Sequence, residues 1–203
     1  MTMVLSVFGL SVLSAFAGII NIKPQVETVI SVTPIKEISE IQPELKVAKL
    51  PIVKNHSSFL NAVGHRESTN NYKAVNQFGY LGKYQFGKGT LKMYGVTNLV
   101  NYKNNPELQE KIFLMNVMRN KWILRREISW YSNRYLGGVY VSESGIIAAA
   151  HLSGPGNVKK YLRSHCDANL NKKDANGTSI SDYMRIFKDY DIEDIPFERK
   201  PKL

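Results

Sequence analysis

The chain has almost no cysteine: Cys166 is the single example among 203 residues. One thiol cannot form a disulfide within the chain, and it supplies far too few ligands for a cysteine zinc site. Proline and glycine are also modest, at 8 and 14 residues, and low-complexity tracts are missing. This composition excludes collagen-like and wholly disordered classes, and the length indicates one packed domain with appendages.

Charge is absent from residues 1–22. Within them, residues 3–20 form an apolar run of the length that is typical of a bilayer span or of a signal-peptide core. Ala15-Phe16-Ala17 matches the small-x-small pattern of a cleavage site. We therefore predict that residues 1–22 are a signal peptide or an N-terminal membrane anchor. Either one predicts an exported protein, periplasmic or associated with the cell envelope, or one tethered to the membrane through residues 3–20.

Glycine is absent from residues 23–54, which instead contain Pro24, Pro34, Pro43 and Pro51. Proline at this spacing prevents a long helix and favours an extended, semi-rigid chain. We predict a linker over 23–54, a folded domain over 55–190 and a C-terminal tail over 191–203.

Acidic side chains are scarce in the predicted domain, where residues 55–188 hold 19 Lys and Arg against 8 Asp and Glu. The whole chain has a net charge of +10. Such an excess favours an anionic partner, such as an anionic envelope surface. No helix-turn-helix, zinc-finger or RNP-like pattern is present, so nucleic acid is not an expected partner. The simpler alternative is a solvated basic surface that only aids solubility.

The predicted domain is mainly helical, with its helix boundaries marked by capping residues. A stretch rich in Gly, Tyr and Asn over residues 72–89 predicts a small β-hairpin. The fold class expected is therefore mainly α, with a small hairpin in an α+β arrangement. The expected helices begin at Ser57 or Ser58 and run to Glu67, begin at Asn105-Pro106, run from Ser142 to a stop at Gly154-Pro155-Gly156, and run from Ser179 to Lys188.

Glu67 occupies an unusual helical position, because it shares a face with the apolar residues Leu60 and Val63. A carboxyl group withdrawn from water favours its protonated form, which a general acid needs near neutral pH. The alternative is a glutamate at a helix end that pairs with Arg66 or Lys73 in solvent.

No Asp or Glu occurs from Ser68 to Pro106. A glycosidase built around Glu67 would therefore lack the nearby second carboxylate of a paired-carboxylate mechanism. An N-acetyl sugar can replace it, since its acetamido oxygen can stabilise the developing oxocarbenium from within the substrate.

Four segments, in this order, resemble motifs of the lytic transglycosylases and goose-type lysozymes of the lysozyme-like superfamily. The resemblance covers residues 55–190 and implies a lysozyme-like helical domain with the hairpin flanking a substrate cleft. It implies Glu67 as the catalytic residue, and Ser68, Asn76, Gly82, Tyr84, Gln85, His151 and Tyr183 as substrate-binding residues. The four segments are Glu67-Ser68, Gly82-Lys83-Tyr84-Gln85, the run AHLSGPG over 150–156, and Tyr183.

The resemblance implies cleavage of the β-1,4 bond between N-acetylmuramic acid and N-acetylglucosamine in peptidoglycan glycan strands. Glu67 would protonate the leaving oxygen and then help to deprotonate the muramyl 6-hydroxyl, which closes a 1,6-anhydro ring. The family's Tyr-Asn pair, whose Asn orients the acetamido group, is His151-Leu152 here. His151, or Asn76 or Gln85 from the opposite wall, would have to take that part.

Two other functions stay open at this point. A hydrolytic muramidase of the same fold could use Glu107, Glu110 or Glu127 to place water. A catalytically inactive wall-binding or assembly module would keep the fold with Glu67 as a structural residue.

No pattern indicates a metal or another cofactor. The four histidines do not match a ligand spacing, and Asp174-Ala175-Asn176-Gly177 is better interpreted as a turn than as a calcium loop. We therefore predict that the protein uses neither.

Overall fold

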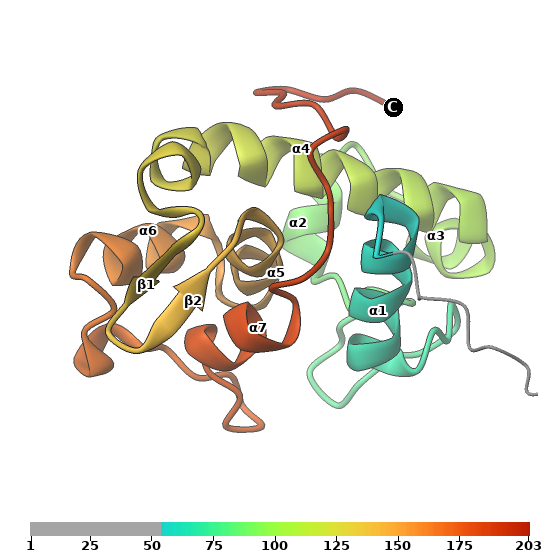
Figure 1. Ribbon diagram of the computed structural model, residues 1–203. Coiled ribbons are helices and arrows are strands. Elements are labelled where there is room, and N and C mark those ends of the chain that lie inside the picture. Colours follow the sequence, from blue (N-terminus) through green and yellow to red (C-terminus); the bar gives the residue numbers. More distant parts are fainter. Residues whose placement is uncertain (1–53) are drawn as a thin grey trace, which may run out of the picture. The chain divides into compact units, whose positions relative to one another are not determined.

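The computed structural model describes residues 54–203 (Figure 1). The predicted signal peptide or anchor, and all of the predicted linker except Lys54, lie outside the described residues. Within residues 54–203, no helix combines the length and the apolar character needed to cross a membrane.

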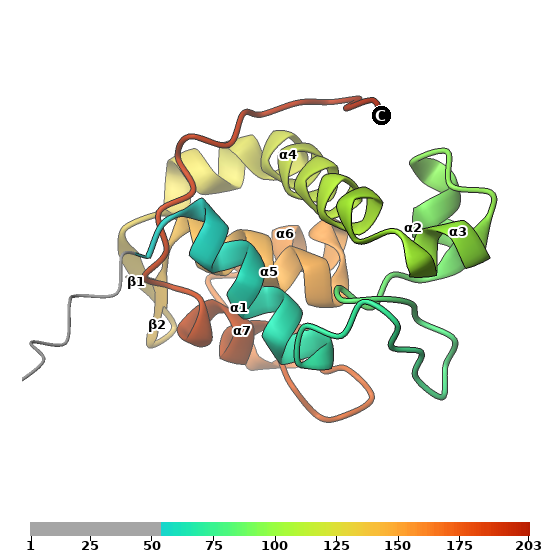
Figure 2. The same cartoon turned by 90° about the vertical axis from the view of Figure 1, so that its right-hand side faces the viewer.

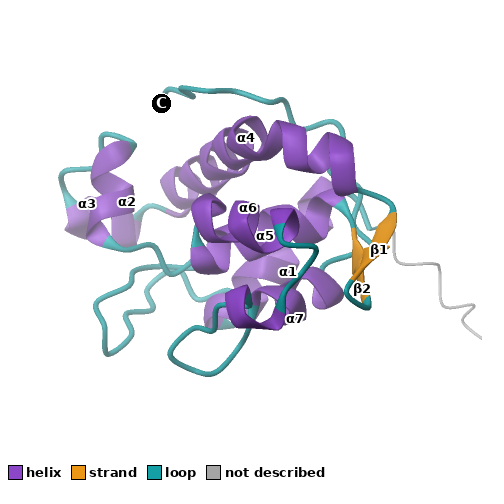
Figure 3. Ribbon diagram, turned by 90° about the vertical axis from the view of Figure 1, so that its left-hand side faces the viewer, coloured by secondary structure: helices purple, strands orange, loops and turns teal. Residues whose placement is uncertain are grey.

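Helices form most of the described part of the chain, and the mainly helical expectation is confirmed (Figure 3). The elements in chain order are α1 (His56–Ser68), α2 (Lys88–Met93), α3 (Leu99–Asn104), α4 (Pro106–Tyr131), β1 (Arg134–Leu136), β2 (Val139–Val141), α5 (Glu143–Ser153), α6 (Pro155–Arg163), the 3-10 helix η1 (Ala168–Leu170) and α7 (Ile180–Ile186).

Side-chain caps set the starts of several of these helices. Asn105 accepts a hydrogen bond from the backbone N–H of Leu108 and begins α4, and Ser142 does the same for α5. Ser179 and Asp182 form a capping box that begins α7. The first helix starts slightly earlier than expected, because Asn55 is its cap instead of a serine.

The two-stranded hairpin exists, but its predicted place over 72–89 is wrong. It is formed by β1 and β2, which pair antiparallel around Gly137-Gly138. Residues 72–89 instead form turns with isolated bridges that join Leu81 to Val75 and to Phe86. The side chain of Gln109 bonds Lys83 N at 2.8 Å and Tyr72 O at 2.9 Å. A side chain thus satisfies backbone groups that a strand ladder would otherwise use.

The central helix of the domain is α5, which packs against α4, α6 and α7 (Figures 1 and 2). Seven consecutive residues of α5, Ser144 to Ala150, are buried. A Cβ atom at Gly145 would lie 2.8 Å from the carbonyl oxygen of Met184, so glycine permits the close approach of α5 and α7. This approach fixes where α7 presents its side chains.

Residues 191–203, expected to be a tail, are attached to the domain. Lys121 of α4 is fully buried, and its Nζ donates hydrogen bonds to the carbonyls of Ile192 and Ile195 at 2.6 and 2.5 Å. Its charge is paired with Glu143 at 2.9 Å. The two isoleucines are buried, and the chain then follows α4 (Figure 2). The core therefore extends beyond residue 190.

Candidate active site

Glu67 lies in the last turn of α1, with its side chain 17% exposed. The hydroxyl of Tyr183 on α7 donates a hydrogen bond of 2.6 Å to its Oε1. Among the described residues, Glu67 forms no ion pair with Arg66 or Lys73. The arrangement is therefore not the solvent-exposed ion pair that the sequence left open, and Oε2 has no described hydrogen-bond partner.

Tyr183 is suited to the role of a fixed donor. Its side chain is buried, and burial, followed by the neighbouring Glu67 carboxyl, raises the pKa of its phenol far above the ordinary value. The phenol therefore keeps its proton at any physiological pH, and its O–H is available as the donor to Oε1 of Glu67.

His151 of α5 provides the opposite wall, with its side chain 8% exposed. Burial lowers the pKa of His151, and the nearby Glu67 carboxyl and Tyr84 carbonyl offset this only in part. The imidazole is therefore neutral at pH 7. Its Nε2 lies 3.0 Å from the carbonyl oxygen of Tyr84. Since a carbonyl can only accept, Nε2 carries the proton and Nδ1 is an acceptor.

Aromatic side chains hold that imidazole in place. The rings of Phe86 and Phe113 both meet it edge-on with centroids 5.2 Å away. Nε2 lies 3.9 Å from Oε1 of Glu67, which is too far for a direct hydrogen bond. His151 thus lies beside the carboxyl group without forming a hydrogen bond to it.

A cavity of about 440 Å³ opens beside Glu67, and we call it the Glu67 cavity. It contains four of the eight predicted site residues: Glu67, Asn76, Gln85 and His151. The remaining lining residues are Phe78, Tyr80, Leu152, Asp174, Ala175 and Asn176.

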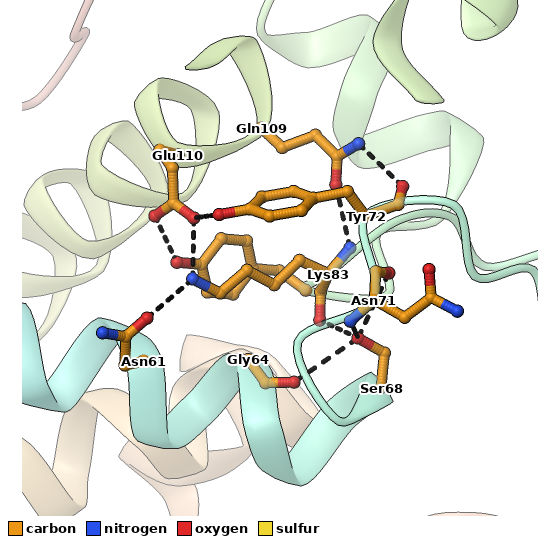
Figure 4. Close-up of polar contacts among 9 residues, drawn as sticks. Asn61, Gly64, Ser68, Asn71, Tyr72, Lys83, Gln109 and Glu110 are labelled. Atoms are coloured by element: carbon orange, nitrogen blue, oxygen red, sulfur yellow. Dashed lines mark hydrogen bonds and ion pairs between the residues drawn. The ribbon is translucent and has the colours of Figure 1, made fainter. Parts of the chain in front are cut away.

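The other four predicted residues do not line this cavity. Tyr183 reaches the site through Glu67 alone. Ser68 donates a hydrogen bond of 2.8 Å to the carbonyl of Lys83 and accepts one from the backbone N–H of Asn71, so it ties the end of α1 to the following turns (Figure 4). These contacts stabilise the backbone next to the Glu67 cavity, although Ser68 itself does not line it.

Gly82 is also behind the wall. It has a φ of +76°, and a Cβ atom there would lie 2.2 Å from Oε1 of Gln109. Its carbonyl accepts a hydrogen bond of 2.8 Å from the Gln85 side chain, which itself lines the Glu67 cavity. The Gly-x-x-Gln segment therefore fixes the orientation of Gln85 through its own first residue.

The ring of Tyr84 is a core residue, because it stacks on Phe113 with centroids 3.8 Å apart. Its hydroxyl donates to Glu110 at 2.5 Å, and Lys83 pairs with the same carboxylate at 2.7 Å (Figure 4). Although burial opposes its charge, hydrogen bonds from Lys83, Tyr84 and Tyr72 hold the pKa of Glu110 below its ordinary value. This ionised network links the 72–89 segment to α4.

None of the three acids considered for placing water lines the Glu67 cavity. Glu110 belongs to the network just described. Glu127 is fully buried and is paired with Arg163 at 2.6 Å. Glu107 lies in the first turn of α4, where it faces the helix N-terminus.

The loop of residues 174–176 lines the Glu67 cavity, which was not predicted from the sequence. Oδ1 of Asp174 accepts backbone hydrogen bonds from Asn176 at 2.9 Å and from Thr178 at 2.7 Å, which confirms a turn there. The turn motif was visible in the sequence. Its position beside Glu67, more than a hundred residues away, had no local signal.

Comparison with protein-family models, with curated proteins and with solved structures finds no match to this chain. Over residues 54–203, no group of three or more His, Cys, Asp or Glu side chains is arranged to hold a metal ion.

Proposed function

We propose that this protein is a peptidoglycan lytic transglycosylase with a lysozyme-like domain, and that Glu67 is its catalytic acid and base. The observation that carries the proposal is the partly buried Glu67 carboxyl, which is hydrogen-bonded at Oε1 by Tyr183 and borders a cavity lined by both polar and apolar side chains. Glycan recognition needs polar and apolar contacts, since sugars present hydroxyls at their edges and C–H groups on their faces.

The surroundings of the Glu67 cavity suit a long chain. A cavity of about 280 Å³, the Asn116 cavity, shares Tyr80, Gln85, His151 and Leu152 with it. Another cavity, of about 420 Å³, shares Asn176 with it. The Glu67 cavity therefore adjoins two further hollows through shared residues, which favours a substrate longer than a single sugar.

Glu67 can carry both proton transfers in this setting. Tyr183 holds Oε1, so the unbonded Oε2 is the atom to protonate the glycosidic oxygen. As the carboxylate, Glu67 then accepts the proton of the muramyl 6-hydroxyl while that oxygen closes the 1,6-anhydro ring. His151, held neutral by burial, lies beside this carboxyl group without forming a hydrogen bond to it.

The acetamido group of the sugar needs a hydrogen-bonding partner. Leu152 lines the cavity, at the position where the lytic transglycosylases that this segment resembles have asparagine, and its side chain cannot hydrogen-bond. Asn76 uses its side-chain oxygen to hold the turn at Phe78 and Tyr80, at 2.9 and 3.0 Å. Gln85, half-buried with its amide nitrogen bonded to Gly82, keeps its side-chain oxygen as an acceptor for the acetamido N–H.

We assign the activity to the cell envelope, because the apolar run of residues 3–20 favours export or tethering and the basic domain favours an anionic wall.

A hydrolytic muramidase is the second candidate, and Asp174 favours it. This carboxylate lines the same cavity as Glu67, and its turn uses Oδ1 alone. A carboxylate in that place could activate a water molecule.

The deciding experiment is incubation of the full chain with purified peptidoglycan, followed by mass measurement of the released muropeptides. We expect 1,6-anhydro ends, and reducing ends would indicate the hydrolase. Glu67→Gln should lower the rate at least about 100-fold, while the exposed Glu193→Gln serves as a matched control. If wild-type protein binds the wall but releases nothing, the enzyme proposal is overturned in favour of a binding module.

A further inference from the structure

A strongly basic cavity adjoins the Asn116 cavity. It measures about 530 Å³ and shares Met93 and Arg119 with its neighbour. We call it the Trp122 cavity, after the indole of α4 that lines it. Its charged lining residues are Arg119, Arg199, Lys200 and Lys202, and no acidic residue lines it.

These four cations are not neutralised within the described part of the chain. None of them takes part in an ion pair among residues 54–203, whereas Lys83, Lys121 and Arg163 are all paired with carboxylates. Four like charges around one hollow repel each other, and an anionic occupant would relieve that repulsion.

Several contacts hold the tail against α4 at the Trp122 cavity. Phe197 lies against the buried Lys121, whose Nζ is 4.7 Å from the ring centroid, and the backbone N–H of Glu198 donates to the carbonyl of Met118 at 3.2 Å. Arg199 then stacks on Trp122, with 5.1 Å from its guanidinium carbon to the ring centroid. The tail thus adds three cations to a wall that α4 supplies.

Resting on the proposed function, we propose that the Trp122 cavity binds carboxylates of the stem peptide carried by the glycan strand that Glu67 cleaves. The three cavities adjoin through shared side chains, so a strand that occupies the Glu67 and Asn116 cavities passes the basic one. Among the parts of such a strand, the peptide carries the carboxylates, and arginine guanidinium groups bind carboxylates with two parallel hydrogen bonds.

The first test compares two substrates: strands that carry their peptides, and the same strands after an amidase has removed them. For the full-length wild type, we expect a KM about tenfold lower on peptide-bearing strands. In the double variant Arg199→Gln, Lys202→Gln that preference should disappear, because these two residues line the Trp122 cavity alone. Lys111 is an exposed cation of α4, and the control variant Lys111→Gln should keep the wild-type preference.

The outcomes separate this inference from the proposed function. A wild type that cleaves both strands with equal KM, or a double variant that keeps the preference, overturns the inference and leaves the lytic activity standing. A wild type that cleaves neither strand overturns the activity, and the binding test below then decides about the cavity.

The binding test uses the fluorescence of Trp122 in a Trp130→Phe background, because these are the two tryptophans of the chain. A soluble disaccharide-tripeptide is titrated into the full chain. A saturable change that the double variant loses supports the proposal, and the same disaccharide without its peptide should cause none. A response to both fragments, or to neither, overturns it, as does a DNA duplex that displaces the peptide fragment at lower concentration.

Discussion

Tyr183 and Glu67 are 116 positions apart, yet the tyrosine hydroxyl lies 2.6 Å from Oε1 of the glutamate. The bond joins the last helix to the first and leaves Oε2 of Glu67 without a described hydrogen-bond partner. A single tyrosine therefore fixes the direction in which the proposed acid acts.

Tyr183→Phe tests this arrangement directly. Removing the hydroxyl deletes the hydrogen bond that holds Oε1 of Glu67, a contribution of about 1–3 kcal/mol. We expect kcat on peptidoglycan to fall about 10- to 100-fold with little change in KM. Circular dichroism should show an unchanged helix content. A fully active phenylalanine variant would show that Glu67 does not need this partner.

Asp174→Asn separates the two candidate reactions. The amide oxygen of asparagine can still accept the turn's hydrogen bonds from residues 176 and 178, whereas the negative charge is lost. For the lytic reaction we expect anhydro products at a rate comparable to that of the wild type. Selective loss of reducing-end products in the mass spectrum would instead identify Asp174 as the group that activates water.

His151 should make the fold sensitive to mild acid. Because burial lowers its pKa below the ordinary 6.5, the unfolded chain binds a proton near pH 6 that the folded chain does not. Stability is therefore full above pH 6.5 and falls as the pH drops through it, with a slope of up to about 1.4 kcal/mol per pH unit.

The check is urea unfolding of the wild type and of His151→Gln between pH 7.5 and pH 5. The groups facing the imidazole are Glu67 and the Tyr84 carbonyl, and both remain in the variant. The difference in unfolding free energy should be constant above pH 7 and shrink below pH 6.5. A constant difference over the whole range contradicts the neutral, buried imidazole.

Gly82 and Gly79 form a matched pair for the 72–89 segment. Their φ values are +76° and +77°, but a Cβ atom meets Gln109 only at Gly82 and has open space at Gly79. Gly79→Ala should cost about 1 kcal/mol through backbone strain alone. Gly82→Ala should cost about 1–3 kcal/mol more through the clash. Equal losses in thermal unfolding would mean that Gln109 can move aside.

Local patterns in the sequence were sufficient to predict where the helices α4, α5 and α7 begin. Asn105-Pro106, Ser142 and the Ser179–Asp182 box all stand at helix starts, because capping depends on residues within one turn of each other. The helical position of Glu67 was likewise predicted from its spacing to Val63.

The hairpin was misplaced because strand pairing depends on competing partners outside the segment. Residues 72–89 have a turn-rich composition, but Gln109 of α4 and the Lys83–Glu110 network occupy their polar groups. The strands form over residues 134–141 instead, where none was predicted. Tyr84 was expected at the cleft because of the family resemblance of its segment, and nothing local shows that its ring stacks on Phe113.

The sequence by itself determined the helical class, the caps and the presence of an isolated acid on an apolar helix face, since all of these depend on neighbours along the chain. Only the tertiary structure brought Tyr183, His151 and the Asp174 turn to Glu67, and placed the cations of residues 199–202 beside Trp122. Those contacts join residues far apart in sequence, and they depend on tertiary packing such as that of α7 against α5.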